Sequence, residues 1–485
     1  MLIFFILGIP ILLAAGAFFS KRPRVFGIIN VFGYLSILLA SIVLLKDIAF
    51  AGHTLFFFSF LYIDTLSAYF IFVISVVSFA TALYSVGYIG KDMQSGAISE
   101  NKAKMYYLLF NLFCFSMFFV PAVNNLGMLW VAIEMTTLIS AFLVGFYNTK
   151  QSVEAAWKYI IICSVGIIFA LLGTILFSYA FSLAGGAKSL NWTDMVAAAG
   201  GMDKNILKVA FIFILVGYGT KAGLAPMHTW LPDAHSQAVT PISALLSGVL
   251  LKTAIYAILR FGIIVIEGVG FGYFSHLMIL LGLISLGVSC SFILVQKDLK
   301  RLLAYSSIEH VGIIAIGLGL GTPLAWGGAL LHVFNHAVTK SLMFFGAGDI
   351  VSAYKRHNMK MIRGVIRVLP FAGVMTLAGM FALTGFPPFS IFVSELIIII
   401  AAFTKGSYVV AVLFLLFIAI IFGAFAYQFG KMLFGNLPKG MAKAPEPLSG
   451  KLAFLFLFVQ MLAVGGVVLF MKKDLLWIVQ GLLTR

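Results

Sequence analysis

The chain has 485 residues, of which 62% are hydrophobic and only 10% are charged, and its formal net charge is +16. A soluble domain carries about 25% charged residues, so a soluble fold of this length would have too little polar surface to cover itself. The basic residues lie in short stretches between apolar segments, which indicates membrane topology rather than nucleic-acid binding. Composition therefore predicts an all-α membrane protein with no soluble domain.

Apolar stretches of about 20 residues, the length that spans a bilayer, follow one another along the chain. The first, 1–19, has no charged segment before it and no obvious cleavage site after it, so we expect a retained span and not a signal peptide. The segment 48–63 is a candidate for a short hairpin at the membrane surface. We predict about fourteen spans, at 2–19, 25–45, 64–90, 105–121, 124–147, 156–182, 206–226, 239–265, 273–296, 301–320, 325–348, 367–402, 407–434 and 452–471.

Loops on the side of Arg22 and Arg24 hold most of the basic residues between spans, including the cluster 355–367. The positive-inside rule then places these loops in the cytoplasm and both termini outside a prokaryotic cell membrane.

The three cysteines lie far apart inside apolar runs, and the sequence has no Cys-x-x-Cys motif or Cys/His cluster. This pattern argues against an iron–sulfur or zinc site in the chain. We therefore expect the chain to carry no cofactor.

Few ionisable residues lie inside the predicted spans, and each costs several kcal/mol to bury. Glu134 and Lys221 are natural partners, because a nearby cation favours the charged form of a buried carboxylate. We interpret them as an ion pair that opens and closes and so changes the proton affinity of the lysine, with a static pair as the alternative. Lys252, centred in span 8, is a candidate proton carrier; the alternative is a lysine that reaches to the interface.

In span 11, His332, His336 and Lys340 are spaced four residues apart, so an α-helix places them along one face. Histidine titrates nearest to physiological pH, and this line of groups predicts a proton relay in the membrane plane. Two histidines at this spacing also suit a metal, but the sequence shows no convergent third ligand and we predict none.

Four further residues are possible accessory groups, and their roles stay open. His228 and His235, in the turn after span 7, are either proton-uptake groups or helix-end hydrogen bonders. The accessory set is completed by Glu309 and His310.

Glycines and prolines interrupt two spans beside an ionisable group. Gly223 and Pro226 follow Lys221, and Pro387-Pro388 precedes Glu395. Such residues break helices, and discontinuous helices near the mid-membrane are where transporters place ion sites.

The two broken spans fall in two candidate repeats of five spans. An odd number of spans inverts the second unit relative to the first. We predict N-terminal helices in 1–104, a first repeat in 105–265, a second, inverted repeat in 273–434, and a last helix with a tail in 435–485.

The run KAGLAPMHTWLPDAHSQA from Lys221 to Ala238, continuing through Thr240-Pro241 to Lys252, resembles the antiporter-like subunits of respiratory complex I, Mrp antiporters and group 4 membrane-bound hydrogenases. The resemblance covers about 60–440. It implies a fourteen-helix fold with broken helices 7 and 12. It also implies that Glu134 and Lys221 form the paired site, that Lys252 is the central lysine, and that Glu395 is the terminal site of the outer half-channel.

Two features bear on the subtype. Glutamate at position 395 is similar to the middle antiporter-like subunit of complex I, and Glu309 followed by His310 is similar to the component F type of hydrogenase-4 and formate hydrogenlyase-like complexes. Because the sequence ends soon after the last predicted span, we expect no long lateral helix of the kind found in the distal antiporter-like subunit of complex I, and we interpret the final Lys472-Lys473-Asp474 segment as an interfacial tail.

Three functions are compatible with these residues. The first is a proton-translocating, non-redox membrane subunit of a redox-driven complex of the hydrogenase or NADH:quinone oxidoreductase type, with other membrane subunits as partners. The second is a Mrp-type sodium/proton antiporter subunit without a redox partner, and sodium stays possible as the ion. The third is a structural spacer, which the set of costly buried charges disfavours.

Overall fold

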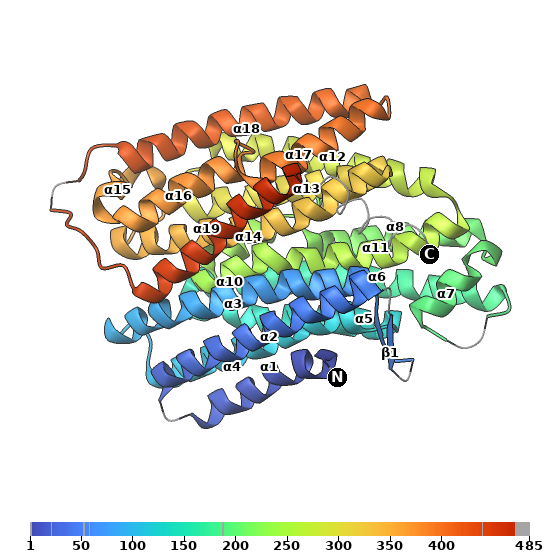
Figure 1. Ribbon diagram of the computed structural model, residues 1–485, viewed down its shortest axis with the longest axis horizontal. Helices are drawn as coiled ribbons and strands as arrows, with labels where there is room; N and C mark the ends of the chain where they lie inside the picture. Colours follow the sequence, from blue (N-terminus) through green and yellow to red (C-terminus); the bar gives the residue numbers. More distant parts are fainter. Residues whose placement is uncertain are drawn as a thin grey trace.

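The structure, a computed structural model, describes residues 2–20, 22–51, 54–57, 59–186, 189–438 and 440–470. It is a bundle of long helices that run along one common direction, with the connections gathered at its two ends (Figure 1). Eleven helical segments of the described residues are long and apolar enough to cross a membrane, and three shorter apolar helices accompany them. The predicted all-α membrane fold is confirmed, while the count of fourteen spans stays a prediction. The proposed interfacial tail lies outside the described residues.

Each predicted span contains a helix. In chain order the helices are α1 (Leu2–Phe19), α2 (Pro23–Ala51), α3 (Thr65–Gln94), α4 (Glu100–Phe119), η1 (Val120–Ala122), α5 (Leu126–Val144), α6 (Lys150–Leu183), α7 (Trp192–Ala198), η2 (Ala199–Gly201), α8 (Lys204–Ala222), α9 (Leu231–Gln237), α10 (Thr240–Leu245), η3 (Leu246–Leu250), α11 (Leu251–Gly268), α12 (Phe271–Val295), α13 (Leu299–Leu320), α14 (Pro323–Tyr354), η4 (Met359–Met361), α15 (Val365–Val368), α16 (Pro370–Leu383), α17 (Ser390–Thr404), α18 (Tyr408–Phe434) and α19 (Leu448–Phe470).

The segment between α2 and α3 forms the predicted hairpin. Strand β1 (Leu55–Phe57) pairs antiparallel with β2 (Leu61–Ile63), and Leu61 forms an isolated bridge to Val123. The hairpin therefore ties the start of α3 to the connection between α4 and α5.

A buried ion pair fastens the same end of the bundle. Asp64, the N-cap of α3, accepts a hydrogen bond from the Ser67 amide. Its carboxylate also accepts hydrogen bonds from both Nη atoms of Arg260 in α11, at 2.7 and 2.6 Å. The guanidinium also lies 4.4 Å from the ring centroid of Trp192 in α7. Bidentate pairing and stacking are contacts that arginine makes and lysine cannot reproduce.

The predicted spans 206–226 and 367–402, which are the seventh and twelfth spans and not the elements labelled α7 and α12, are broken, as expected. In the first break α8 ends at Ala222 and α9 starts at Leu231, and Gly223 adopts a left-handed φ of 78°. In the second break α16 ends before Gly385, which has a φ of 66°, and α17 follows. Glycine adopts this conformation without the steric cost that other residues meet. Each break therefore has a left-handed glycine just after the end of the preceding helix.

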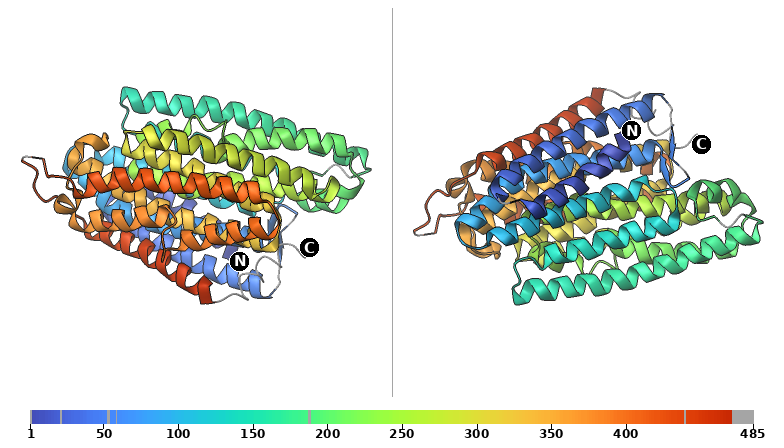
Figure 2. Two further views of the ribbon diagram at one scale, coloured as in Figure 1. Left: turned by 90° about the horizontal axis from the view of Figure 1, so that it is seen from above. Right: turned by 90° about the horizontal axis from the view of Figure 1, so that it is seen from below.

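The helices differ in how far they are enclosed. In the most apolar 18-residue window, all of α13 and 89% of the α10–α11 segment are buried, against 39% of α6 and 28% of α18. Helix α6 forms an edge of the bundle in both views of Figure 2. Apolar faces on outer helices suit lipid or neighbouring subunits, so the interior of this membrane protein lies around α13 and its neighbours.

The basic loops meet at one end of the bundle. Asp233 in α9 contacts Lys158 of α6 at 3.5 Å and Arg301 of α13 at 3.1 Å. The adjoining loops are paired by a bridge between Asp298 and Asn358. These contacts bring together segments that the charge pattern assigned to one side of the membrane.

Candidate functional site

Lys221 lies in the last turn of α8, directly before the first break, and is 1% exposed. Its Nζ atom donates a hydrogen bond to the Tyr159 hydroxyl at 3.0 Å, and that hydroxyl pairs with Ser140 at 2.8 Å. The lysine is thus held by a neutral oxygen from α6.

The predicted partner, Glu134, has other contacts. Its carboxylate accepts hydrogen bonds from Ser164 at 2.9 Å and from Thr137 at 3.1 Å. Among the salt bridges within the described part of the chain, none joins Glu134 to Lys221. The pair is therefore open in this structure, and its closing stays a prediction.

Lys252 lies just after a π-helical turn, η3, which the sequence does not reveal. Its Nζ atom donates to the carbonyl of Ser247, a residue of that turn. The Ser247 hydroxyl in turn pairs with Ser307 of α13 at 2.7 Å. Because π-helical turns rearrange the backbone hydrogen bonds of a helix, this turn supplies an oxygen to a lysine that is 1% exposed.

Lys340 on α14 is fully buried. Its Nζ atom donates to the Leu303 carbonyl at 2.6 Å and to the Ser306 hydroxyl, both on α13. The accessory residue Glu309 lies one turn further along α13, is 3% exposed, and interacts electrostatically with Lys340. Lys221, Lys252 and Lys340 therefore all bond to neutral oxygens.

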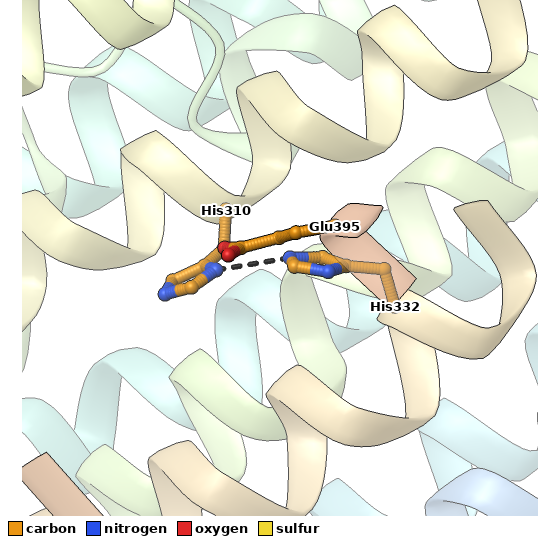
Figure 3. Close-up of side chains that lie close together, drawn as sticks. All are labelled: His310, His332 and Glu395. Atoms are coloured by element: carbon orange, nitrogen blue, oxygen red, sulfur yellow. Dashed lines mark hydrogen bonds between the residues drawn. The ribbon is translucent and has the colours of Figure 1, made fainter. Parts of the chain in front are cut away.

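The histidines of α13 and α14 form a connected cluster (Figure 3). His310 Nδ1 lies 2.9 Å from His332 Nε2, and the His336 ring centroid is 4.5 Å from that of His310. His310, which the sequence offers only as an accessory group, is thus at the centre of the cluster. The structure brings together residues of two helices that sequence spacing cannot relate.

Ser394 on α17 sets the orientation of His332. Its hydroxyl donates to the Ile391 carbonyl, accepts from the Asn335 amide, and lies 2.9 Å from His332 Nδ1. Because a hydroxyl has one proton, we assign the proton of this last bond to Nδ1. His332 Nε2 then accepts the proton of His310 Nδ1.

Glu395 follows Ser394 directly and completes the cluster. One ligand-capable atom from each of His310, His332 and Glu395 lies within 4.8 Å of the other two (Figure 3). The Glu395 carboxylate packs against Gly385, where a Cβ atom would lie 2.1 Å from Oε2. The third convergent group, which the sequence does not show, therefore comes from the helix after the second break.

The two turn histidines occupy different environments. His235 is fully buried, packs against Trp230 and Phe344, and interacts electrostatically with Lys252 and Lys340. His228 is 8% exposed and lies beside Tyr305 near the basic end. His235 therefore belongs with the central lysines.

Comparison with known proteins identifies the chain's relatives. A family model described as "NADH:quinone oxidoreductase/Mrp antiporter, TM" matches residues 123–423. The chain belongs to this family. A second model, described as the N-terminus of complex I chain 5, matches residues 56–96. All the candidate residues, from Glu134 to Glu395, lie within the first match.

Individual relatives in this antiporter family cover most of the chain. The chain is 38% identical to a hydrogenase-4 component F homolog of Methylacidiphilum infernorum over 79% of this chain and 80% of that protein. It is 30% identical to a Na⁺/H⁺ antiporter subunit of Alkalihalophilus pseudofirmus over 84% and 82%. A chain of the membrane-bound sulfane sulfur reductase, an archaeal respiratory membrane complex, superposes with a TM-score of 0.86 at 25% identity, covering 99% and 96%.

Sequence reasoning missed Tyr159 and Ser394, which hold two of the predicted residues in this antiporter-family chain. Both act across helices, since Tyr159 bonds to a lysine 62 positions away and Ser394 to a histidine equally distant. A tyrosine or serine in an apolar helix carries no distinctive pattern, so neither could be found without the packing.

Proposed function

We propose that the chain is a proton-translocating membrane subunit of a redox-driven, multi-subunit complex. The observation that carries this proposal is the buried line of ionisable groups from Lys340 through His336, His310 and His332 to Glu395. Ionisable residues inside membrane spans are costly and mark ion pathways. Groups on three separate helices that converge on one line are hard to explain as independent packing features.

The inner half of the path starts at the basic end, which we assign to the cytoplasm, with both termini outside. Lys221 and Lys252 load protons there, and His235 interacts electrostatically with both Lys252 and Lys340. The open arrangement of Glu134 and Lys221, with Tyr159 bonded to the lysine, is one of the two states that the cycle requires. Closing the pair places a negative charge beside Lys221 and favours its protonated form.

The outer half of the path ends at Glu395. We propose that 105–265 and 273–434 are inverted repeats, each with a broken helix beside its ionisable group. Two features support this division: Gly223 and Gly385 both have left-handed conformations, and each is followed by a proline three residues later. Protons then cross from the first unit to the second along the middle of the membrane.

The relatives' names indicate the type of complex. A hydrogenase-4 component F homolog and a chain of an archaeal respiratory complex are among them. We infer that other subunits carry out the electron transfer and that this chain responds electrostatically. Its own residues bind, hold and release protons at the stated atoms.

The test uses the intact complex in inverted membrane vesicles, with acidification followed while the redox substrate is supplied. We expect Lys221→Ala and Glu134→Gln to lower proton pumping while the complex still assembles. Lys204→Ala, an exposed lysine on the same helix α8, is the matched control and should pump normally. Unchanged pumping in both Lys221 and Glu134 variants would make the pair structural and would reject this path.

A second candidate is a Mrp-type sodium/proton antiporter subunit, favoured by the 30% identity to a Na⁺/H⁺ antiporter subunit over most of both chains. The same vesicles distinguish the two. A sodium gradient imposed without redox substrate should produce no proton movement if the first proposal holds. Sodium-driven acidification without redox substrate would establish the antiporter function instead.

A further inference from the structure

We propose that His310, His332 and Glu395 form a binding site for a divalent cation of the zinc class. The three side chains come from α13, α14 and α17 and converge on one point in the protein interior (Figure 3). Their ligand atoms lie within 4.8 Å of one another, and the side chains are at most 4% exposed.

The donor set indicates the kind of cation. Two imidazole nitrogens with one carboxylate oxygen suit Zn²⁺ and related transition metals, while Mg²⁺ and Ca²⁺ prefer oxygen ligands. Ligands at about 2.0–2.2 Å from zinc in a tetrahedron are themselves a little over 3 Å apart. The two nitrogens already lie 2.9 Å apart, so only the carboxylate has to approach.

His332 is held as metal-ligating histidines usually are, by a hydrogen bond to the ring nitrogen on the side away from the ion. His332 Nδ1 bonds to Ser394, which leaves Nε2 facing the site. His310 Nδ1 faces His332, and His310 Nε2 is buried without a hydrogen-bond partner among the described residues. Helix α17, which follows the second break, thus supplies both the Ser394 hydroxyl that orients His332 and the Glu395 carboxylate.

Charge also fits a divalent ion. Glu395 binds the ion as a carboxylate, so it releases any proton that it holds and then supplies one negative charge. Glu309, which interacts electrostatically with Glu395, is a second acidic group nearby. Lys252 and Lys340 act on His310 in the opposite sense and limit the affinity. Binding displaces the single proton between the facing nitrogens of His310 and His332. That proton moves to His310 Nε2, because a neutral imidazole with one nitrogen on a metal carries its proton on the other.

The cation and the transported proton therefore compete for the same atoms. A bound ion occupies His310 and His332 and stops transfer between Lys340 and Glu395. This inhibition rests on the proposed proton path, whereas the binding itself does not.

The experiment loads the purified intact complex with Co²⁺ and records visible absorption and cobalt content per complex. We expect the wild-type complex to bind one more cobalt ion than the His310→Gln or His332→Gln complex. The visible spectrum of wild type should also show the intense absorption bands of cobalt with few ligands. His276→Gln, an exposed histidine on α12, is the matched control and should bind like wild type. Equal cobalt content and spectra in wild type and both site variants would overturn the proposal.

Two further measurements test the site even if the His310→Gln and His332→Gln complexes fail to assemble. X-ray absorption of the Zn²⁺-loaded wild-type complex should show two imidazoles and a carboxylate around zinc, and a zinc shell without imidazole would overturn the site. Ser394→Ala, which keeps all three ligands, should weaken cobalt binding by about 10–100-fold; unchanged affinity would contradict the assigned orientation of His332.

Pumping measured with added Zn²⁺ separates the two proposals. Both proposals are supported if Zn²⁺ inhibits wild type and if the residual pumping of Ser394→Ala needs about 10–100-fold more Zn²⁺ for the same fractional inhibition. Cobalt bound at these residues without inhibition keeps the metal site and contradicts the proton path. If His310→Gln loses pumping but wild type binds no more cobalt than the site variants, the proton path is supported and the metal site is rejected.

Discussion

Gly385 provides a direct test of how closely the second break positions Glu395. The residue has a left-handed φ of 66°, and a Cβ atom there would lie 2.1 Å from Glu395 Oε2. An ordinary contact between these atoms is about 3.4 Å, so Gly385→Ala displaces the carboxylate by roughly 1 Å. A displacement of this size costs about 10²-fold in reactions that depend on positioning. We therefore expect pumping to fall by one to two orders of magnitude.

The backbone strain of the substitution has to be separated from the displacement. Alanine in the left-handed region costs about 1–2 kcal/mol, and this part is shared by Gly406→Ala at the end of α17. Gly406 has a φ of 77°, and nothing lies within 4 Å of its added Cβ. The assay compares redox-driven acidification of vesicles, normalised to assembled complex, for both variants. If Gly385→Ala pumps like Gly406→Ala, the position of the Glu395 carboxylate does not control proton release.

Three other substitutions test contacts that hold the site or the bundle. Tyr159→Phe removes the hydroxyl bonded to Lys221, a contact to a charged group worth about 1.5–3 kcal/mol, and we expect lower pumping with normal assembly; unaltered pumping would show that the hydroxyl is dispensable. Ser394→Ala should reduce pumping about tenfold by releasing the histidine that it orients, whereas the exposed Ser291→Ala, which loses only a bond within its own helix, should not. Arg260→Lys should lower the thermal stability of the complex by about 2 kcal/mol, measured by thermal unfolding, because one ammonium cannot replace the bidentate pair; equal melting temperatures would contradict this.

Much of the fold follows from the sequence because a bilayer imposes a simple length rule. The predicted spans each contain a helix, and the breaks beside Lys221 and Glu395 were visible from their glycines and prolines. The hairpin in 48–63 was also anticipated. The π-helical turn before Lys252 was not, because its residues, Leu246–Leu250, are ordinary in an α-helix.

The residues of the candidate site could be predicted from the sequence, but the contacts between residues on different helices could not. Charge in an apolar setting singles out Lys340 and Glu395, and helical spacing relates His332 to His336. The approach of α13 to α14 depends on packing, so His310 was assigned a minor role. The sequence also could not predict that Glu134 and Lys221 are unpaired in this structure. Residue types show which groups are able to form an ion pair, but they do not show whether the pair is formed.

The Ser394 hydrogen bond gives the histidine pair a direction, and this direction has a consequence for leakage. With Nδ1 of His332 protonated and bonded to Ser394, the free Nε2 atom of His332 accepts a proton from His310 Nδ1. After one such transfer the proton of His332 sits on Nε2 and points back toward His310, so a second transfer is blocked until the original form is restored. On the proposed path we therefore expect the cluster to pass one proton and then stop. We expect a resting complex to conserve the proton gradient without a closing gate, and turnover to be limited by the step that restores the first orientation.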